Sequence, residues 1–170
     1  MKYKRLILFV GNVLLIFFAA GFSKMLILDH CIGKVLTDTN AFLSLVLVTN
    51  DGAAFNLFSG FNAVLIGFAA VIILLCMCYV LFYKLFISEK FLLFMAMFCA
   101  GIFGNAYERY MYDCVTDYIK VNVLNFPVFN LYDILITLGA LSIVLWLVKD
   151  KTMEIQENKN VEEDDLYRDL

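Results

Sequence analysis

The chain has 170 residues, of which 63% are hydrophobic and 17% are charged, and its formal net charge at pH 7 is −3. This apolar content is higher than a water-soluble domain tolerates, so the composition indicates a membrane protein with several spans. The chain contains a single histidine, which excludes most histidine-based metal sites and serine–histidine catalytic centres.

The N-terminal segment combines a basic start with a long apolar run. Residues 2–5 (KYKR) are followed by residues 6–22, which carry no charge. A cleaved signal peptide has an apolar core of only about 7–15 residues and a small-residue cleavage site, whereas Lys24 stands here where cleavage would fall. We therefore expect a first transmembrane helix over residues 6–28 that begins in the cytoplasm, because basic residues favour that side.

A change of pattern follows, from residue 29 to residue 60. Residues 42–48 are rich in aliphatic and β-branched side chains, and turn-forming residues follow directly at Asn50, Asp51 and Gly52. Such a run followed by a turn is typical of a hairpin. The sequence therefore predicts a short β-hairpin within residues 36–60, on the outer face of the membrane.

Three further charge-poor runs are long enough to cross the bilayer, over residues 61–83, 91–108 and 128–148. The segments that would follow the second and fourth runs in the cytoplasm carry lysines, so we expect four spans with both termini in the cytoplasm. The domain organisation is then one membrane-embedded domain over residues 1–150 and an acidic cytoplasmic tail over residues 151–170. We expect the tail to be solvated and poorly ordered.

Polar groups gather between the third and fourth runs. They are Asn105, Glu108, Arg109, Asp113, Asp117, Asn130 and Asp133. Asn105, Glu108 and Arg109 share one helical face, as Asn130 and Asp133 do on the next helix. Polar groups at a helix end can simply contact lipid headgroups and water. An unpaired carboxylate one turn inside a span has a high free-energy cost, however, which favours a functional role for Asp133.

Asp117 and Asp133 are the candidates for chemistry. If Asp117 folds back against Asp133, two carboxyls at close range cannot both ionise easily and share one proton. One carboxyl then activates a water as a base, while the other donates a proton to a substrate carbonyl. This is the chemistry of aspartic peptidases.

Motifs in three separate parts of the chain resemble those of bacterial lipoprotein signal peptidase, also called signal peptidase II. Residues 50–55 (NDGAAF) match the N-x-G-A-A-F element of that family. Residues 104–109 (GNAYER) with residues 115–119 (VTDYI) are similar to its G-N-x-x-D-R and V-x-D-[FY]-I block. Residues 126–133 (FPVFNLYD) resemble its F-P-x-F-N-x-A-D block.

The resemblance implies a membrane aspartic endopeptidase that cleaves signal peptides from diacylglyceryl-modified prolipoproteins without a metal or another cofactor. The implied fold class is an all-α membrane protein of four transmembrane helices with a small extracytoplasmic β-cradle over residues 36–60. The implied place is the bacterial cytoplasmic (inner) membrane, with the active site near the outer face. We expect membrane lipid and prolipoproteins as partners, no nucleic acid, and a monomer.

The resemblance also assigns roles to single residues. It implies that Asp117 and Asp133 are the catalytic pair. The residues that it implies support the site or bind substrate are Asn50, Gly52, Phe55, Asn105, Glu108, Arg109 and Asn130. Phe55 has two readings of equal weight, as a lid over the pair or as an aromatic anchor at the membrane interface.

Three positions depart from the family pattern: Glu108 stands in place of Asp, Tyr132 in place of Ala, and Ala20 in place of an acid near the end of the first span. Without that acid, we expect Lys24 to be a snorkelling anchor at the membrane edge. Ala20 and Glu108 favour an alternative, a non-catalytic protein that binds lipidated peptides on the same scaffold.

Two further possibilities stay open. A small transporter or channel could also use intramembrane acids, but the first two spans are almost bare of the polar residues that a water path requires. Cys31 and Cys114 could meet outside the membrane and form a disulfide, although nothing in the sequence requires one.

Overall fold

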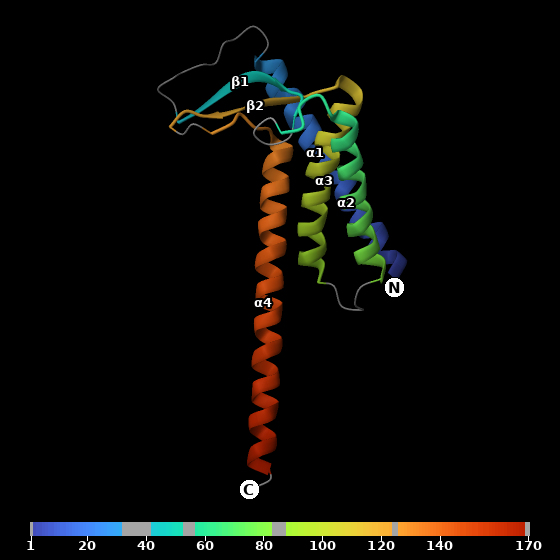
Figure 1. The fold of residues 1–170 in the computed structure, drawn as a ribbon, viewed down its shortest axis with the longest axis vertical. Coiled ribbons are helices and arrows are strands. Elements are labelled where there is room, and N and C mark those ends of the chain that lie inside the picture. The colour runs from blue at the N-terminus through green and yellow to red at the C-terminus, as the bar shows by residue number, and fades with distance from the viewer. Residues whose placement is uncertain (1, 32–41, 53–56, 83–87, 124–125, 169–170) are drawn as a thin grey trace.

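The computed structural model describes residues 2–31, 42–52, 57–82, 88–123 and 126–168, with only the backbone described for residues 2, 30, 31 and 154–168. In chain order its elements are α1 (Lys2–Cys31), β1 (Leu43–Asn50), α2 (Asn62–Phe82), α3 (Glu89–Tyr112), β2 (Val115–Val121) and α4 (Leu131–Arg168). Each helix is long and apolar enough to cross a membrane. The predicted fold class is confirmed: four membrane-length helices with a small two-stranded sheet at one end (Figure 1).

α3 is the central helix, and α1, α2 and α4 all pack against it (Figure 1). Over half of its membrane-length window is buried (56%), against 17% or less for the other three helices. Small residues permit the closest contact, with α4: a Cβ at Gly101 would lie 2.5 Å from the Tyr132 carbonyl oxygen, and one at Gly139 would lie 2.6 Å from the Phe98 nitrogen. α3 therefore fixes where α4 begins.

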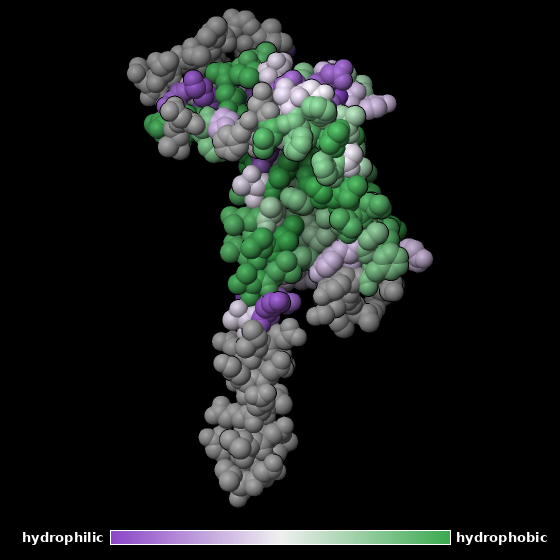
Figure 2. Space-filling view, in the orientation of Figure 1, coloured by the Kyte–Doolittle hydropathy of each residue, from purple (hydrophilic) through white to green (hydrophobic). Residues whose placement is uncertain are grey.

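The outward faces of the helices are apolar. Figure 2 shows a hydrophobic surface over the helices, while polar residues gather near the sheet and at the opposite helix ends. Large side chains such as Leu15, Phe68 and Leu145 are more than half exposed. Lipid tails are the solvent in which such a surface is stable, which supports a multi-pass membrane protein.

The sheet is formed by strands far apart in the sequence. β1 pairs antiparallel with β2, with Val48 opposite Asp117 and Asn50 opposite Val115. Among the described residues β1 thus pairs with β2 and not with a neighbouring strand of a hairpin within residues 36–60, while residues 36–41 and 53–56 lie outside the described residues. The physical reason is that β2 is itself a run of β-branched and aromatic residues, and α3 delivers it to the same end of the molecule as β1.

The C-terminal segment continues α4 to Arg168, so the predicted poorly ordered tail is wrong for its backbone. No glycine or proline stands between Ala140 and Arg168 to end the helix. The segment is also rich in Glu, Gln and Lys, which favour helix over coil. Figure 1 shows α4 extending beyond the other helices on the side opposite the sheet.

Gly104 gives the first testable prediction. A Cβ at this position would lie 2.3 Å from the Tyr132 Cδ1 atom, and the Tyr132 ring stacks at 6.1 Å on Phe17, which leaves it little room to move. We expect Gly104→Ala to destabilise the protein by about 1–3 kcal/mol through overpacking, seen as a lower unfolding temperature in detergent. In a Tyr132→Ala background, which is itself destabilised by loss of the buried ring, the same change at Gly104 should cost much less.

Gly67→Ala is the matched control, because a Cβ at Gly67 on α2 meets nothing within 4 Å. We expect this variant to unfold at or slightly above the wild-type temperature, since alanine favours helix over glycine. Equal unfolding temperatures for Gly104→Ala and Gly67→Ala would contradict the close contact between α3 and α4.

Candidate active site

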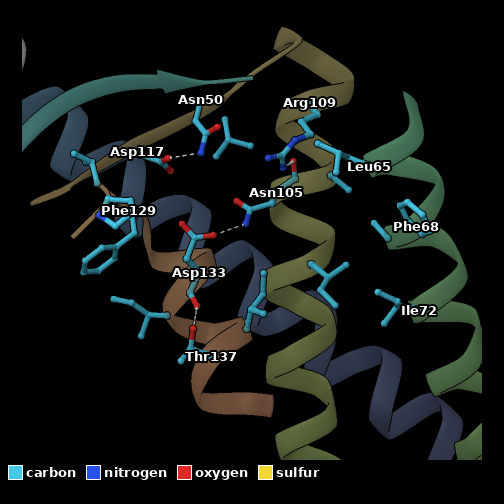
Figure 3. A pocket seen from close by; sticks show the side chains of 18 of the residues that line it. Asn50, Leu65, Phe68, Ile72, Asn105, Arg109, Asp117, Phe129, Asp133 and Thr137 are labelled. Atoms are coloured by element: carbon cyan, nitrogen blue, oxygen red, sulfur yellow. Dashed lines mark hydrogen bonds between the residues drawn. The ribbon is translucent and has the colours of Figure 1, made fainter. Parts of the chain in front are cut away.

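The candidate site lies where the sheet meets the first turn of α4 (Figure 3). α3 ends at Tyr112, and its C-cap residue Asp113 takes a left-handed conformation (φ 58°) and turns the chain into β2. β2 then bonds to the segment before α4, through Ile119 N–H to the Phe129 oxygen (2.8 Å) and Phe129 N–H to the Ile119 oxygen (3.0 Å). This connection brings Asp117 of β2 close to Asp133 of α4.

Asn130 caps α4 and links both acids. Its Oδ1 accepts hydrogen bonds from the backbone N–H of Tyr132 (2.7 Å) and of Asp133 (3.1 Å). The Asp133 carboxylate accepts in return from the Asn130 N–H (2.9 Å), which completes a reciprocal cap. The Asn130 Nδ2 donates to Asp117 (2.7 Å) and to the Asn105 oxygen (3.1 Å). One side chain, fully buried at 0% exposure, thus joins the helix start to the strand.

Two further amides bind the remaining carboxyl oxygens. Asn105 of α3 donates from Nδ2 to Asp133 at 2.8 Å, and Asn50 at the end of β1 donates to Asp117 at 3.0 Å (Figure 3). Each carboxyl therefore accepts a bond at both oxygens. The amides supply donors without adding positive charge, and their hydrogen bonds favour the charged form of each carboxyl, whereas burial favours the protonated form.

Burial raises the pKa of Asp117, whose exposure is only 3%. The hydrogen bonds from Asn50 and Asn130 lower that pKa, the negative charge of Asp133 raises it, and the positive charge of Lys24 lowers it. Burial is the largest of these effects, so Asp117 keeps its proton to a higher pH than an ordinary aspartic acid.

Arg109 ties the loop after β1 to α3. Its guanidinium donates to the Gly52 carbonyl and, at 3.1 Å, to the Asn105 carbonyl. Gly52 N–H in turn donates to the Asn50 side chain at 3.0 Å. Gly52 therefore holds Asn50 and Arg109 together beside the two acids. Phe55, the remaining predicted support, lies outside the described residues.

Glu108 does not touch the two acids but pairs with Lys24 of α1. The Lys24 Nζ lies 2.5 and 2.6 Å from the two Glu108 oxygens and donates to the Thr116 carbonyl at 2.8 Å. Lys24 is only 7% exposed, so the expected snorkelling anchor is wrong. The sequence held one signal for this contact: a charge at the end of an apolar run needs a partner, and Glu108 lies at the same depth.

A cavity of about 690 Å³ opens beside the two acids. Its walls are mainly apolar side chains from three helices, among them Leu65, Phe68 and Ile72 of α2 (Figure 3). Asn50, Asn105, Arg109, Asp117 and Asp133 supply the polar part of its lining. A long apolar group would fit this cavity, with its polar end at the carboxyls.

Comparison with known proteins decides the family. Residues 12–149 match the sequence model of the family described as signal peptidase (SPase) II. The chain belongs to the signal peptidase II family. The expected family and the expectation of a membrane peptidase are thereby confirmed.

Named relatives and solved structures agree with this family. The chain is 31% identical to the lipoprotein signal peptidase of Clostridium tetani, over 72% of this chain and 80% of that one. It is 27% identical to that of Lactobacillus gasseri, over 86% and 95%. A solved structure described as "Bacterial membrane enzyme structure by the in meso method at 2.3 A resolution" is similar to this chain, with a TM-score of 0.72. The two are 22% identical, over 84% of this chain and 88% of that chain, and the likeness supports the fold.

Two departures from the signal peptidase II pattern are buried. The Tyr132 ring lies over Gly104 and its hydroxyl approaches α1, where a Cβ at Gly21 would be 3.1 Å away. Ala20, at the position of the missing acid, is buried at 5% exposure. The bulk of Tyr132 is thus accommodated by small residues on α1 and α3, on the side away from the cavity lining.

The remaining candidates stay outside the site. Asp113 is exposed and ends α3, so it does not join the two acids. Cys114 is a free thiol, and the side chain of Cys31, its possible partner, lies outside the described part of the chain. Among the described residues there is no group of three or more His, Cys, Asp or Glu side chains placed to hold a metal ion.

The amide of Asn50 gives a prediction on pH dependence. Because its hydrogen bond favours the charged form of Asp117, Asn50→Ala should raise the pKa of Asp117 further. If activity requires one proton on the pair, the alkaline limb of the kcat/KM profile should move up by about 0.5–1 pH unit, the equivalent of one hydrogen bond. The measurement is the pH–rate profile of purified enzyme in detergent.

Asp51→Asn is the control for this experiment, since Asp51 is an exposed neighbour whose carboxylate binds Ser59. Its profile should coincide with that of the wild type. An Asn50→Ala profile that also coincides with the wild type would show that this amide does not set the protonation of Asp117.

Proposed function

We propose that this protein is a lipoprotein signal peptidase that hydrolyses the amide bond before the diacylglyceryl-modified cysteine of prolipoproteins. Membership of the signal peptidase II family supports this substrate class. The observation that carries the proposed mechanism is the hydrogen-bond network in which Asn130 joins Asp117 to the first turn of α4, where Asp133 stands.

In the proposed mechanism, Asp117 and Asp133 share one proton. Two carboxyls that lie close together in a buried site cannot both ionise easily, and the burial that raises the pKa of Asp117 favours a retained proton. The charged carboxyl takes a proton from water, and the water oxygen attacks the substrate carbonyl. The protonated carboxyl donates to the carbonyl oxygen, which gives a tetrahedral intermediate. The C–N bond then breaks as the proton of the first step goes to the leaving amine, and the second carboxyl takes its proton back from a hydroxyl of the intermediate. The titration belongs to the pair rather than to either residue.

The apolar cavity supports a lipid-modified substrate. Its α2 wall carries Leu65, Phe68 and Ile72, while the acids lie at its polar end. An acyl chain against these side chains would place the modified cysteine near Asp117 and Asp133. Arg109 and Asn105 also line the cavity and would bind the peptide backbone of the substrate near the scissile bond.

We further propose a place and an orientation for the protein. The lysines and arginine at the start of α1 and the lysines after α4 favour the cytoplasmic side for both termini of the domain spanning residues 1–150 and its tail over residues 151–170. The sheet and the two acids then lie at the outer face of the bacterial cytoplasmic membrane. We expect the enzyme to act as a monomer, in contact with membrane lipid.

The two sequence features that favour a non-catalytic binding protein, Glu108 and Ala20, have structural explanations. Glu108 is occupied with Lys24 and with the Thr116 N–H, and Ala20 is packed in the helix bundle. Neither departure removes a bond to Asp117 or Asp133. Both carboxyls keep the donors that a working pair needs.

The test is cleavage of a lipidated prolipoprotein in detergent. We expect Asp117→Asn and Asp133→Asn each to lower kcat by at least about 10²–10⁴-fold, because each removes one member of the acid–base pair. Asp113→Asn is the matched control, since Asp113 is exposed and asparagine tolerates its left-handed backbone. This variant should cleave at the wild-type rate.

Full activity in either variant of the pair would reject the proposed mechanism. Tight binding of the lipidated peptide by the wild type with no product would instead support the non-catalytic alternative.

A further inference from the structure

We infer that Lys24 and Glu108 are positioning residues that set the place of Asp117 by holding both backbone hydrogen-bonding groups of Thr116, the residue before it. The inference rests on the proposed function, because it assigns Asp117 a part in the reaction. Neither Lys24 nor Glu108 lines the cavity, so neither would meet the substrate directly.

The geometry is a junction of three elements. Lys24 comes from α1, Glu108 from α3 and Thr116 from β2. The Lys24 Nζ donates to the Thr116 carbonyl at 2.8 Å, and the Thr116 N–H donates to Glu108 Oε2 at 2.9 Å. The 2.5 Å contact between Lys24 and Glu108 closes the ring.

The pairing of β2 explains why Thr116 is available for this contact. In an antiparallel ladder, alternate residues point their N–H and C=O groups away from the partner strand. Thr116 lies opposite Thr49, and its outward-pointing groups bind the charged pair. Asp117, next along the strand, then faces Asn50 and Asn130. A shift at Thr116 would move Asp117 directly.

Burial argues that the pair does more than stabilise the fold. Lys24 and Glu108 are 7% and 8% exposed, and the rings of Tyr118 and Tyr132 lie 5.7 and 6.0 Å from the Lys24 Nζ. Removing two charges from water is costly, and apolar side chains of similar volume often stabilise a fold equally well. Apolar side chains cannot, however, bind both backbone groups of Thr116. Misplacing a catalytic group by about 1 Å can cost about 10²-fold in rate.

Lys24 also acts on Asp117 through its charge. Among the other charged groups nearby, Asp133 of α4 acts on Asp117 directly, Arg109 of α3 interacts with both acids, and Glu108 of α3 acts on Arg109. The side chains facing it from β1 and from the cap of α4 are the neutral amides of Asn50 and Asn130. Removing the Lys24 charge alone would raise the pKa of Asp117, whereas removing Glu108 with it takes away the opposite charge. A fall in kcat at unchanged KM is therefore the readout for the double variant, because a purely structural pair would not produce it.

The experiment is the double variant Lys24→Met/Glu108→Met, which removes both charges together and nearly preserves side-chain volume. We expect its unfolding temperature in detergent to stay within a few degrees of the wild type. We expect kcat for a lipidated prolipoprotein to fall about 10–100-fold while KM stays within about threefold. Lys120→Met, which removes an exposed lysine from the same strand, is the control and should match the wild type.

A folded double variant with kcat within about twofold of the wild type would overturn the inference. If the double variant does not fold, Glu108→Gln decides, since the amide lacks the negative charge and turns an NH2 donor toward either the Lys24 ammonium or the Thr116 N–H in place of a carboxylate oxygen. A drop in kcat of about tenfold at unchanged KM is expected, and a wild-type kcat would overturn the inference. Inactive Asp117→Asn beside an active double variant would reject only the positioning role, whereas active Asp117→Asn would reject the proposed mechanism itself.

Discussion

The hydrogen bonds of the Asn130 side chain are the constraint on which the site depends. The side chain caps α4 through Oδ1 and binds Asp117 and Asn105 through Nδ2. The helix that carries Asp133 and the strand that carries Asp117 are therefore held by one amide. Asparagine suits this position because it offers an acceptor and two donors at once, whereas aspartate would bring a third negative charge beside the pair.

The helix bundle positions the Asn130 amide. α3 contributes glycines that let α4 approach closely, then delivers Asn105 to one side of the site and β2 to the other. Apolar side chains on the exterior are stable against lipid tails. Each polar group inside needs a hydrogen-bond partner from the protein, because water is scarce there. The site meets this requirement with amides at the two acids and with Lys24 at Glu108.

Much of the architecture could be predicted from local sequence. The four spans follow from apolar length, and the family follows from motifs whose spacing the fold preserves. The partner of β1 could not be predicted from turn residues, because strand pairing is non-local and β2 stands about 70 positions away. The role of Lys24 was missed for the same reason, since its carboxylate partner lies on another helix. The roles of Asp117 and Asp133 in catalysis remain predictions.

The most direct test of the central claim is the protonation of the pair itself. Infrared spectra of enzyme labelled with ¹³C at its aspartate carboxyls separate these acids from Glu108 and can be followed as pH rises. A shared proton predicts a protonated carboxyl band that persists near neutral pH in the wild type and is absent in both Asp117→Asn and Asp133→Asn. Fully ionised aspartates throughout that range, with no such band in the wild type, would contradict it.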